Sequence, residues 1–265
     1  MLRLDSSYCY RNAMKIIVSV KQVPSRDSAL KVDAAGKWLD ESDLSFEMNE
    51  PDAYALEEAL QLKEKLGGEV VVLSAGPERA TQTIREALAK GADRAIHVEL
   101  EEGSVLDALA TAQILAKALE GEAPDLILTG LQSDDMGYGQ TGVVLAELLG
   151  FAHATIVMEV EPLGATVRVK RELEDGWFQN VVLSLPAVLT IQSGIKKLRY
   201  ATLMGIKKAK TKEIKTIPAA SVSAAASIEK VYLPLRNKQS QILTGDAKDV
   251  AKQLVEKLKF EARVI

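Results

Sequence analysis

The first 150 residues alternate between short apolar runs and longer amphipathic stretches. Valine and isoleucine dominate the runs KIIVSVK at 15–21 and EVVVLSA at 69–75, and similar runs lie at 94–98 and 125–129. Short runs that are apolar at nearly every position are typical of strands buried on both faces of a parallel sheet. The pattern therefore predicts four buried strands in this half of the chain.

The stretches between these strands have helical spacing and recognisable end signals. Asn49 is a good N-cap and Pro51 suits a first turn, so a helix is predicted from there to about Leu66. Further helices are expected at about 80–90, from a cap at Ser104 to about 119, and at about 140–149. This alternation predicts an α/β fold with an open, mostly parallel sheet and helices on both faces. Ligands bind such sheets beyond the carboxyl ends of the strands.

The pattern changes after Gly150. Segments 154–160, 165–172 and 178–185 are expected to be antiparallel strands, and 187–192 to be another. Residues 201–212 are compatible with a helix.

A long arm follows, at 213–245. It contains apolar residues without a helical period, and Pro218 and Pro234 interrupt it. A structureless stretch of this length is unusual in a compact domain, and this one is too apolar for a simple linker. We expect it to lie along another protein's surface; the alternative is that it wraps its own domain. Asp246 then predicts the cap of an amphipathic helix that ends near Phe260.

Composition narrows the classes of function. The 265 residues are 47% hydrophobic, which allows one large domain with a long arm, and the net charge of −4 indicates neither a nucleic-acid surface nor a polybasic membrane anchor. The single cysteine, Cys9, excludes a disulfide framework, and His97 and His153 lack metal-ligand spacing. Residues 1–13 lack the apolar region of a signal peptide and are expected to be a disordered leader.

The glycine-rich loop GLQSDDMGYGQTG at 130–142 follows a strand and opens a helix. Gly137, Gly139 and Gly142 formally match GxGxxG, but the dinucleotide fingerprint belongs to the first strand–helix turn of its domain, so an NAD site is rejected. Glycines and a helix start still favour an anion, and Gln140 and Thr141 would offer further donors. No Walker lysine follows, which disfavours ATP hydrolysis and suits a monophosphate. A purely structural turn is the alternative.

Several ordered pieces of the chain resemble the beta subunits of electron-transfer flavoproteins, from about Met14 to the C-terminus. They are VSVKQVP, MNEPDAYALEEALQLKE, SAGP, IREALAKGADRAIHV, the glycine-rich loop, VKRELEDG, LPAVLTIQ and RYATLMGIKKAK. The resemblance implies a fold of the adenine-nucleotide-binding kind. It divides the chain into the leader at 1–13, a core at 14–190, a partner-recognition loop and helix at 191–213, and an arm and helix at 214–265 that pack on the partner.

The resemblance also implies a function. The chain would hold a structural AMP and pair with an alpha subunit that carries most of the FAD site. FAD would accept electrons from acyl-CoA or other dehydrogenases and pass them to a quinone-linked oxidoreductase. Such a subunit is an electron carrier of the bacterial cytoplasm rather than an enzyme, which agrees with the missing catalytic constellation, because the cofactor performs the chemistry.

Site residues are implied position by position. The AMP contacts would come from Ser19, Asn49, Glu50, Pro51, Asp52, Ala75, Gly130, Gln132, Asp135, Gly137, Gly139, Gln140 and Thr141. The partner contacts would come from Glu172, Arg199, Tyr200, Leu203 and Lys208. Leu203 would be the anchor of the recognition loop, and the alternative is that it is a core residue of the following helix. Glu172 would form a charge pair across subunits, or be an ordinary solvated strand residue.

Two positions differ from residues found in parts of the family. Arg26 stands where some relatives carry a tyrosine near the flavin, and Thr141 stands where the electron-bifurcating branch, which holds a second FAD in place of AMP, carries a valine. A hydroxyl at the helix start suits a terminal phosphate, so AMP is favoured over a second FAD. Two further classes of protein compete with this assignment, namely a stand-alone ATP- or AMP-binding module and an ATP-cleaving enzyme of the same fold.

Overall fold

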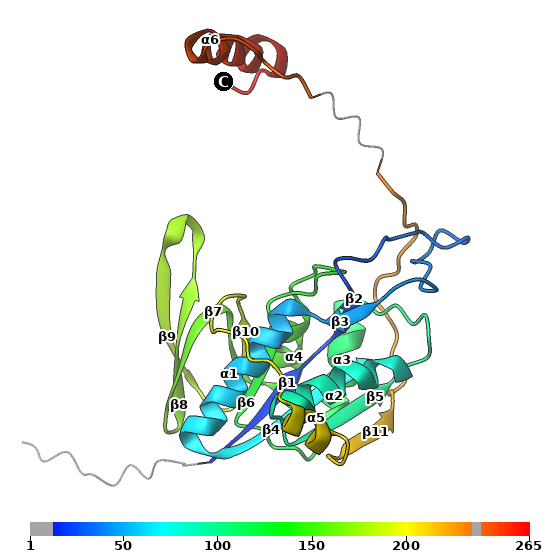
Figure 1. Cartoon of the computed structure of the whole chain (residues 1–265). Coiled ribbons are helices and arrows are strands. Elements are labelled where there is room, and N and C mark those ends of the chain that lie inside the picture. The colour runs from blue at the N-terminus through cyan, green and yellow to red at the C-terminus, as the bar shows by residue number, and fades with distance from the viewer. Residues whose placement is uncertain (1–12, 235–239) are drawn as a thin grey trace, which may run out of the picture. The chain divides into compact units, whose positions relative to one another are not determined.

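The computed structural model describes residues 13–234 and 240–265, and Figure 1 shows their elements. The leader expected at 1–13 therefore lies almost entirely outside the described residues. The described chain forms two units, the first reaching Val231 and the second beginning at Tyr232.

A large sheet forms the centre of the first unit. Its strands, in spatial order, are β11 (Ile214–Pro218), β5 (Arg94–Glu99), β4 (Gly68–Gly76), β1 (Met14–Ser19), β6 (Leu126–Gly130), β10 (Ala187–Ile191), β7 (Ala152–Leu163), β8 (Thr166–Glu172) and β9 (Phe178–Ser184). Neighbours from β11 to β7 pair in parallel, whereas β7, β8 and β9 pair antiparallel. Two short strands, β2 (Gln22–Pro24) and β3 (Phe46–Met48), form a separate antiparallel pair.

Helices cover both faces of this sheet, which confirms the predicted fold class. The α-helices of the described residues are α1 (Glu50–Leu66), α2 (Thr81–Lys90), α3 (Ala108–Ala118), α4 (Thr141–Leu149), α5 (Leu203–Ala209) and α6 (Ala247–Lys257). Ile16 and Val18 of β1 pack in one core with α1 and α2, and Ile17 packs in a second core with α3 and α4. Because neighbouring residues of a strand point to opposite faces, both faces of β1 must be apolar.

The prediction that 187–192 is an antiparallel strand was wrong. All five residues of β10 are buried, and the strand lies parallel between β6 and β7, with Ala187 opposite both Leu126 and Ala152. A fully buried position in a parallel sheet explains the unbroken apolar run AVLTI.

The predicted cap at Ser104 was also wrong. Asp107 is the N-cap of α3, and its side chain accepts a hydrogen bond from the backbone N–H of Ala110. Aspartate and serine are comparable N-cap residues, so the residue type alone does not distinguish the two positions. The cap lies three residues later than predicted, and the rest of the helix is as expected.

The first half of the arm lies on its own domain. Residues Ile214–Pro218 form the edge strand β11 beside β5, and Ala219 N–H donates to the carbonyl of Glu99 at 3.3 Å. Ile214 packs in the core with α1 and α2 while Ile217 packs in the other, so the apolar residues that lacked a helical period follow the period of a strand. Residues 214–231 therefore wrap their own domain, which was the alternative given for the arm.

The second unit contains the predicted amphipathic helix. Asp246 caps α6 by accepting from the N–H groups of Lys248 and Asp249 at 2.9 and 3.1 Å. None of the residues of α6 is buried, and Leu254, Val255 and Phe260 of the helix and the turn after it are exposed. Its packing on a partner subunit stays a prediction.

Candidate functional site

A cavity of about 210 Å³ lies where β1, β4 and β6 end at their carboxyl ends. Ser19 ends β1, Ala75 lies one residue before the end of β4, and Gly130 ends β6; all three line the cavity. This is the edge at which open parallel sheets bind ligands.

Most residues predicted for the nucleotide site line this cavity. They are Ser19, Asn49, Asp52, Ala75, Gly130, Gln132, Asp135, Gly139, Gln140 and Thr141. Glu50, Pro51 and Gly137 do not line it: Glu50 forms an ion pair with Arg26, and Pro51 is buried beside Gly130. The structure thus brings the predicted residues together from four separate segments, while their contact with a nucleotide stays a prediction.

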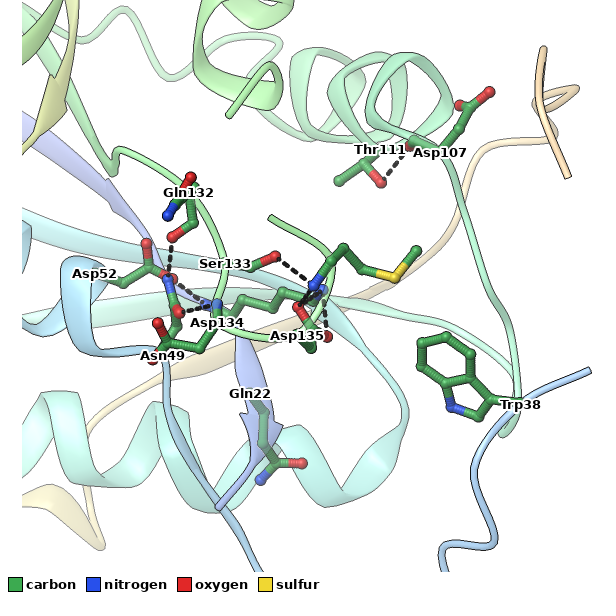
Figure 2. Close-up of polar contacts among 12 residues, drawn as sticks. Gln22, Trp38, Asn49, Asp52, Asp107, Thr111, Gln132, Ser133, Asp134 and Asp135 are labelled. Atoms are coloured by element: carbon green, nitrogen blue, oxygen red, sulfur yellow. Dashed lines mark hydrogen bonds and ion pairs between the residues drawn. The ribbon is translucent and has the colours of Figure 1, made fainter. Parts of the chain in front are cut away.

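Asn49 fastens the glycine-rich loop instead of capping its helix. It occupies the N-cap position of α1, but its side chain makes no cap bond. Its amide Nδ2 donates to the carbonyl of Gln132 at 3.0 Å, and its Oδ1 accepts from the N–H of Asp134 at 2.9 Å, as Figure 2 shows. The expected capping role was wrong because both amide atoms are used by a loop more than 80 residues away.

Asp52 joins α1 to the ends of two strands. Asp52 is only 7% exposed, and its carboxylate accepts from the N–H groups of Lys21 at 2.8 Å and Gly130 at 2.9 Å. Burial raises the pKa of Asp52 to about 7, although hydrogen bonds from Lys21, Asn49 and Gly130 favour the charged form. A Cβ on Gly130 would lie 2.7 Å from Cβ of Pro51, so only glycine permits this close approach.

The start of α4 faces the cavity without a cap. The first N–H groups of any helix have no intrahelical acceptor, and here the side chain of Gln140 at the N-cap position does not supply one either. A Cβ on Gly142 would lie 2.7 Å from Thr129 Oγ1 and from Thr190 Cγ2, and glycine therefore lets the helix start approach β6 and β10. Uncapped N–H groups and the positive end of the helix fit an anion.

The charged side chains around the loop are paired with one another. Lys21 Nζ contacts Asp135 Oδ2 at 2.6 Å, and Arg26 bonds to both Glu50 and Asp134. The two loop aspartates thus hold the loop by ion pairs. Among residues 13–234 and 240–265, no cluster of three or more His, Cys, Asp or Glu side chains has the arrangement of a metal site.

One side of the cavity was not predicted. Arg79 lies with its guanidinium carbon 3.8 Å from the centroid of the Phe46 ring, and its Nη1 donates to Gln22 at 2.8 Å. Arg79 Nη2 also donates to Glu41 at 2.9 Å, and Glu41 accepts from Trp38 Nε1 at 3.1 Å. These residues come from distant segments of the chain. The sequence offered one indication of this wall, namely that Arg79 lies in the turn after the predicted strand at 69–75, which is β4.

Exposure separates the predicted partner residues into two groups. Leu203 at the first turn of α5 is 81% exposed and Tyr200 is 93% exposed, so the alternative that Leu203 is a core residue was wrong. Lys208 is exposed on the same helix, and Glu172 at the end of β8 accepts from Gln192 at 3.3 Å. Arg199 is instead engaged within the chain.

Arg199 clamps its loop onto α1. Its Nε donates to Glu57 at 2.8 Å and its Nη1 to Glu64 at 2.6 Å. The side chain of Glu57 is 4% exposed, so the pair is sheltered from solvent on one side. A guanidinium held by two carboxylates of its own chain positions the loop rather than reaching outward.

None of the helices in the described parts of the chain combines the length and apolarity that crossing a bilayer requires.

Comparison with known proteins points to one family. A family model described as "Electron transfer flavoprotein domain" matches residues 37–222. The beta subunit of the electron transfer flavoprotein of Bradyrhizobium diazoefficiens is 42% identical over 257 residues, which cover 95% of this chain and 100% of the relative. The corresponding subunit of Methylophilus methylotrophus is 38% identical over 86% of this chain and 92% of the relative, and that of Homo sapiens is 35% identical over 95% and 99%.

Proposed function

We propose a function from one premise: the chain belongs to the electron transfer flavoprotein family, as the matched family model and the beta-subunit relatives show. The chain is a beta subunit that binds AMP in the cavity beyond β1, β4 and β6. It pairs with a flavin-carrying alpha subunit. Together the two subunits carry electrons from acyl-CoA or other dehydrogenases to a quinone-linked oxidoreductase.

The observation that carries the AMP assignment is the uncapped start of α4 at the cavity. Gln140 and Thr141 line the cavity there, and the free N–H groups of the first turn supply hydrogen bonds to a phosphate. Among the lining residues the cationic side chains are Lys21 and Arg79, and each is paired with a carboxylate. A single phosphate suits such a site better than a triphosphate, whose larger charge would require unpaired cations.

The role of this chain is to bind and to orient. AMP acts as a bound ligand that stabilises the folded subunit, since it binds the native state and not the unfolded chain. FAD, held mainly by the alpha subunit, supplies the electron-transfer chemistry. The recognition loop presents Leu203 and Tyr200 to dehydrogenases, and Lys208 adds positive charge beside it.

The second unit supports the proposal of a permanent partner. Leu254 and Val255 of α6 are 47% and 52% exposed, and Phe260 after the helix is 68% exposed. Three exposed large apolar side chains on this amphipathic helix and the turn after it favour a protein surface as its docking site. A stand-alone nucleotide-binding module would have no use for such a helix.

The test is the nucleotide content of the purified complex after denaturation. We expect one AMP and one FAD per pair of subunits. Two FAD and no AMP would instead assign the complex to the electron-bifurcating branch. A monomer without adenylate or flavin partner would contradict the proposal altogether.

A further inference from the structure

The wall of the nucleotide cavity has an outer side that faces the arm. Trp38, Glu41, Gly103 and Val105 line the cavity, and the same four residues also line a second groove. The rest of that groove's lining includes arm residues 224 and 226–228. The arm therefore runs along the back of a wall whose front is the proposed AMP site; Figure 2 shows Trp38 of this wall and Asp107 at the start of α3.

Asp107 fastens the arm on one side of the wall. Its Oδ2 accepts hydrogen bonds from the backbone N–H groups of Ala225 at 2.6 Å and Ala226 at 2.8 Å. Its Oδ1 accepts from Ala110 at 2.7 Å and so caps α3. The two carboxylate oxygens thus have separate tasks, and the side chain does not itself line the cavity.

A second pair of contacts fastens the arm a few residues further along the chain. Lys37 Nζ donates to the carbonyl of Glu229 at 2.6 Å, and Val231 N–H donates to the carbonyl of Gly36 at 2.8 Å. Both contacts are made to the hairpin around the bridge between Val32 and Leu39, which carries Trp38. The arm consequently ties the hairpin, on one side of the cavity, to the start of α3.

We propose that residues 219–231 are a strap that braces the outer wall of the nucleotide cavity, and that Asp107 is the positioning residue that fastens it. The inference rests on the proposed function, namely that the cavity holds AMP. A ligand leaves its site faster when a wall of the site opens locally, and a loop with few apolar contacts opens at low cost unless something restrains it. Releasing the strap removes that restraint from the wall that carries Trp38.

Asp107→Asn separates the strap from the helix cap. The amide oxygen still accepts from Ala110, whereas the new NH₂ group faces the N–H donors of Ala225 and Ala226. In the full-length chain purified with its alpha subunit, we expect AMP to dissociate about fivefold faster or more, because two charge-assisted hydrogen bonds are lost. Hydrogen exchange at Ala225 and Ala226 should accelerate, while the thermal midpoint of the AMP-free complex should stay close to that of the wild type.

The matched control is Asp246→Asn, the same substitution at the N-cap of α6. It should leave AMP dissociation unchanged. Lys37→Met, which removes the contact with Glu229, should accelerate dissociation in the same direction and decides the question if Asp107→Asn folds poorly.

Four results would overturn the inference. Wild-type AMP dissociation from Asp107→Asn, despite faster exchange at Ala225 and Ala226, would show that the strap does not brace the wall. Unchanged exchange would show that Asp107 does not hold the arm. Wild-type AMP dissociation from Lys37→Met would show that the contact with Glu229, at the other end of the strap, does not brace the wall. A wild-type complex that contains no AMP would refute the proposed function itself, and the inference with it.

Discussion

Asp52 is the residue on which three segments of the site converge. Its carboxylate accepts hydrogen bonds from the N–H of Lys21, two residues after the end of β1, and from the N–H of Gly130 at the end of β6, and Asp52 itself stands in the first turn of α1. Burial raises its pKa from 3.8 to about 7. In the unfolded chain the same group loses its proton near pH 4, so between about pH 4 and pH 7 the folded chain binds more protons than the unfolded one.

The free energy of unfolding should therefore fall as the pH rises from about 4 to about 7, by up to about 4 kcal/mol from this group. Asp52→Asn cannot ionise and should flatten this part of the profile. It should also cost about 1–3 kcal/mol at low pH, because its NH₂ group leaves one backbone N–H without an acceptor. Denaturant unfolding at several pH values measures both effects. The exposed Asp175→Asn is the control and should keep the wild-type slope, and the same slope in Asp52→Asn would contradict the argument.

Thr141 offers a second test at this scale. It is the first residue of α4 and lines the cavity, so its hydroxyl is expected to donate to the phosphate. Thr141→Val keeps the shape of the side chain and should weaken AMP binding about tenfold, the effect of one hydrogen bond to a charged group. Thr81→Val is the matched control, because Thr81 is the first residue of α2 and does not line the cavity. Titration of nucleotide-stripped complex with AMP gives the affinities, and equal affinities would show that the hydroxyl is idle.

At the scale of elements, α1 connects the cavity to the loop that we propose as the partner-recognition loop. Its first turn carries Asp52, while Glu57 and Glu64 in its later turns hold Arg199. Glu58, which is buried, lies 3.6 Å from Lys196 in the same loop. The loop is thus held by several ion pairs on one helix, which orders it up to the cap that Thr202 provides for α5.

This ordering leaves Leu203 pointing away from the core, and it sets the third prediction. Leu203→Ala should slow electron transfer from a dehydrogenase about tenfold, the cost expected for truncating an interface anchor. Because the side chain is 81% exposed, the thermal midpoint should stay nearly constant. Leu30→Ala, at a leucine that is 50% exposed outside the loop, is the control. Unchanged dehydrogenase-dependent flavin reduction would remove Leu203 from the recognition surface.

Buried elements could be predicted from the sequence, whereas their ends and partners could not. The strands β1, β4, β5 and β6 and the helices that follow β1, β4 and β6 agree with the pattern, since burial on both faces leaves an unbroken apolar run. The same run in β10 carries no sign of strand direction, which is why an antiparallel strand was expected there. Asn49 had the right place for a cap, but tertiary contacts claimed both of its amide atoms.

At the scale of the whole molecule, the candidate site is assembled across most of the first unit. The glycine-rich loop was found from sequence because its residues are contiguous. Trp38, Phe46 and Arg79 were missed because each belongs to a different segment, and only the folded chain brings them to one wall. The arm was expected to lie on another protein for a related reason. Asp107, which holds it, is 118 residues from Ala225, and a contact over that separation leaves no pattern in the sequence.

If the cavity binds AMP as proposed, the ligand joins several segments of the fold, and this gives the last prediction. Removing AMP should lower the thermal midpoint of the complex, because a ligand present at 100 times its Kd stabilises the native state by about 2.7 kcal/mol. For a unit of this size that corresponds to roughly 5–10 °C. AMP added back should restore the midpoint, whereas adenosine should restore much less, since it lacks the phosphate that the uncapped start of α4 is expected to bind. Differential scanning calorimetry with the two ligands makes the comparison. Equal rescue by adenosine would move the anion site away from α4, and no rescue by either ligand would separate the cavity from nucleotide binding.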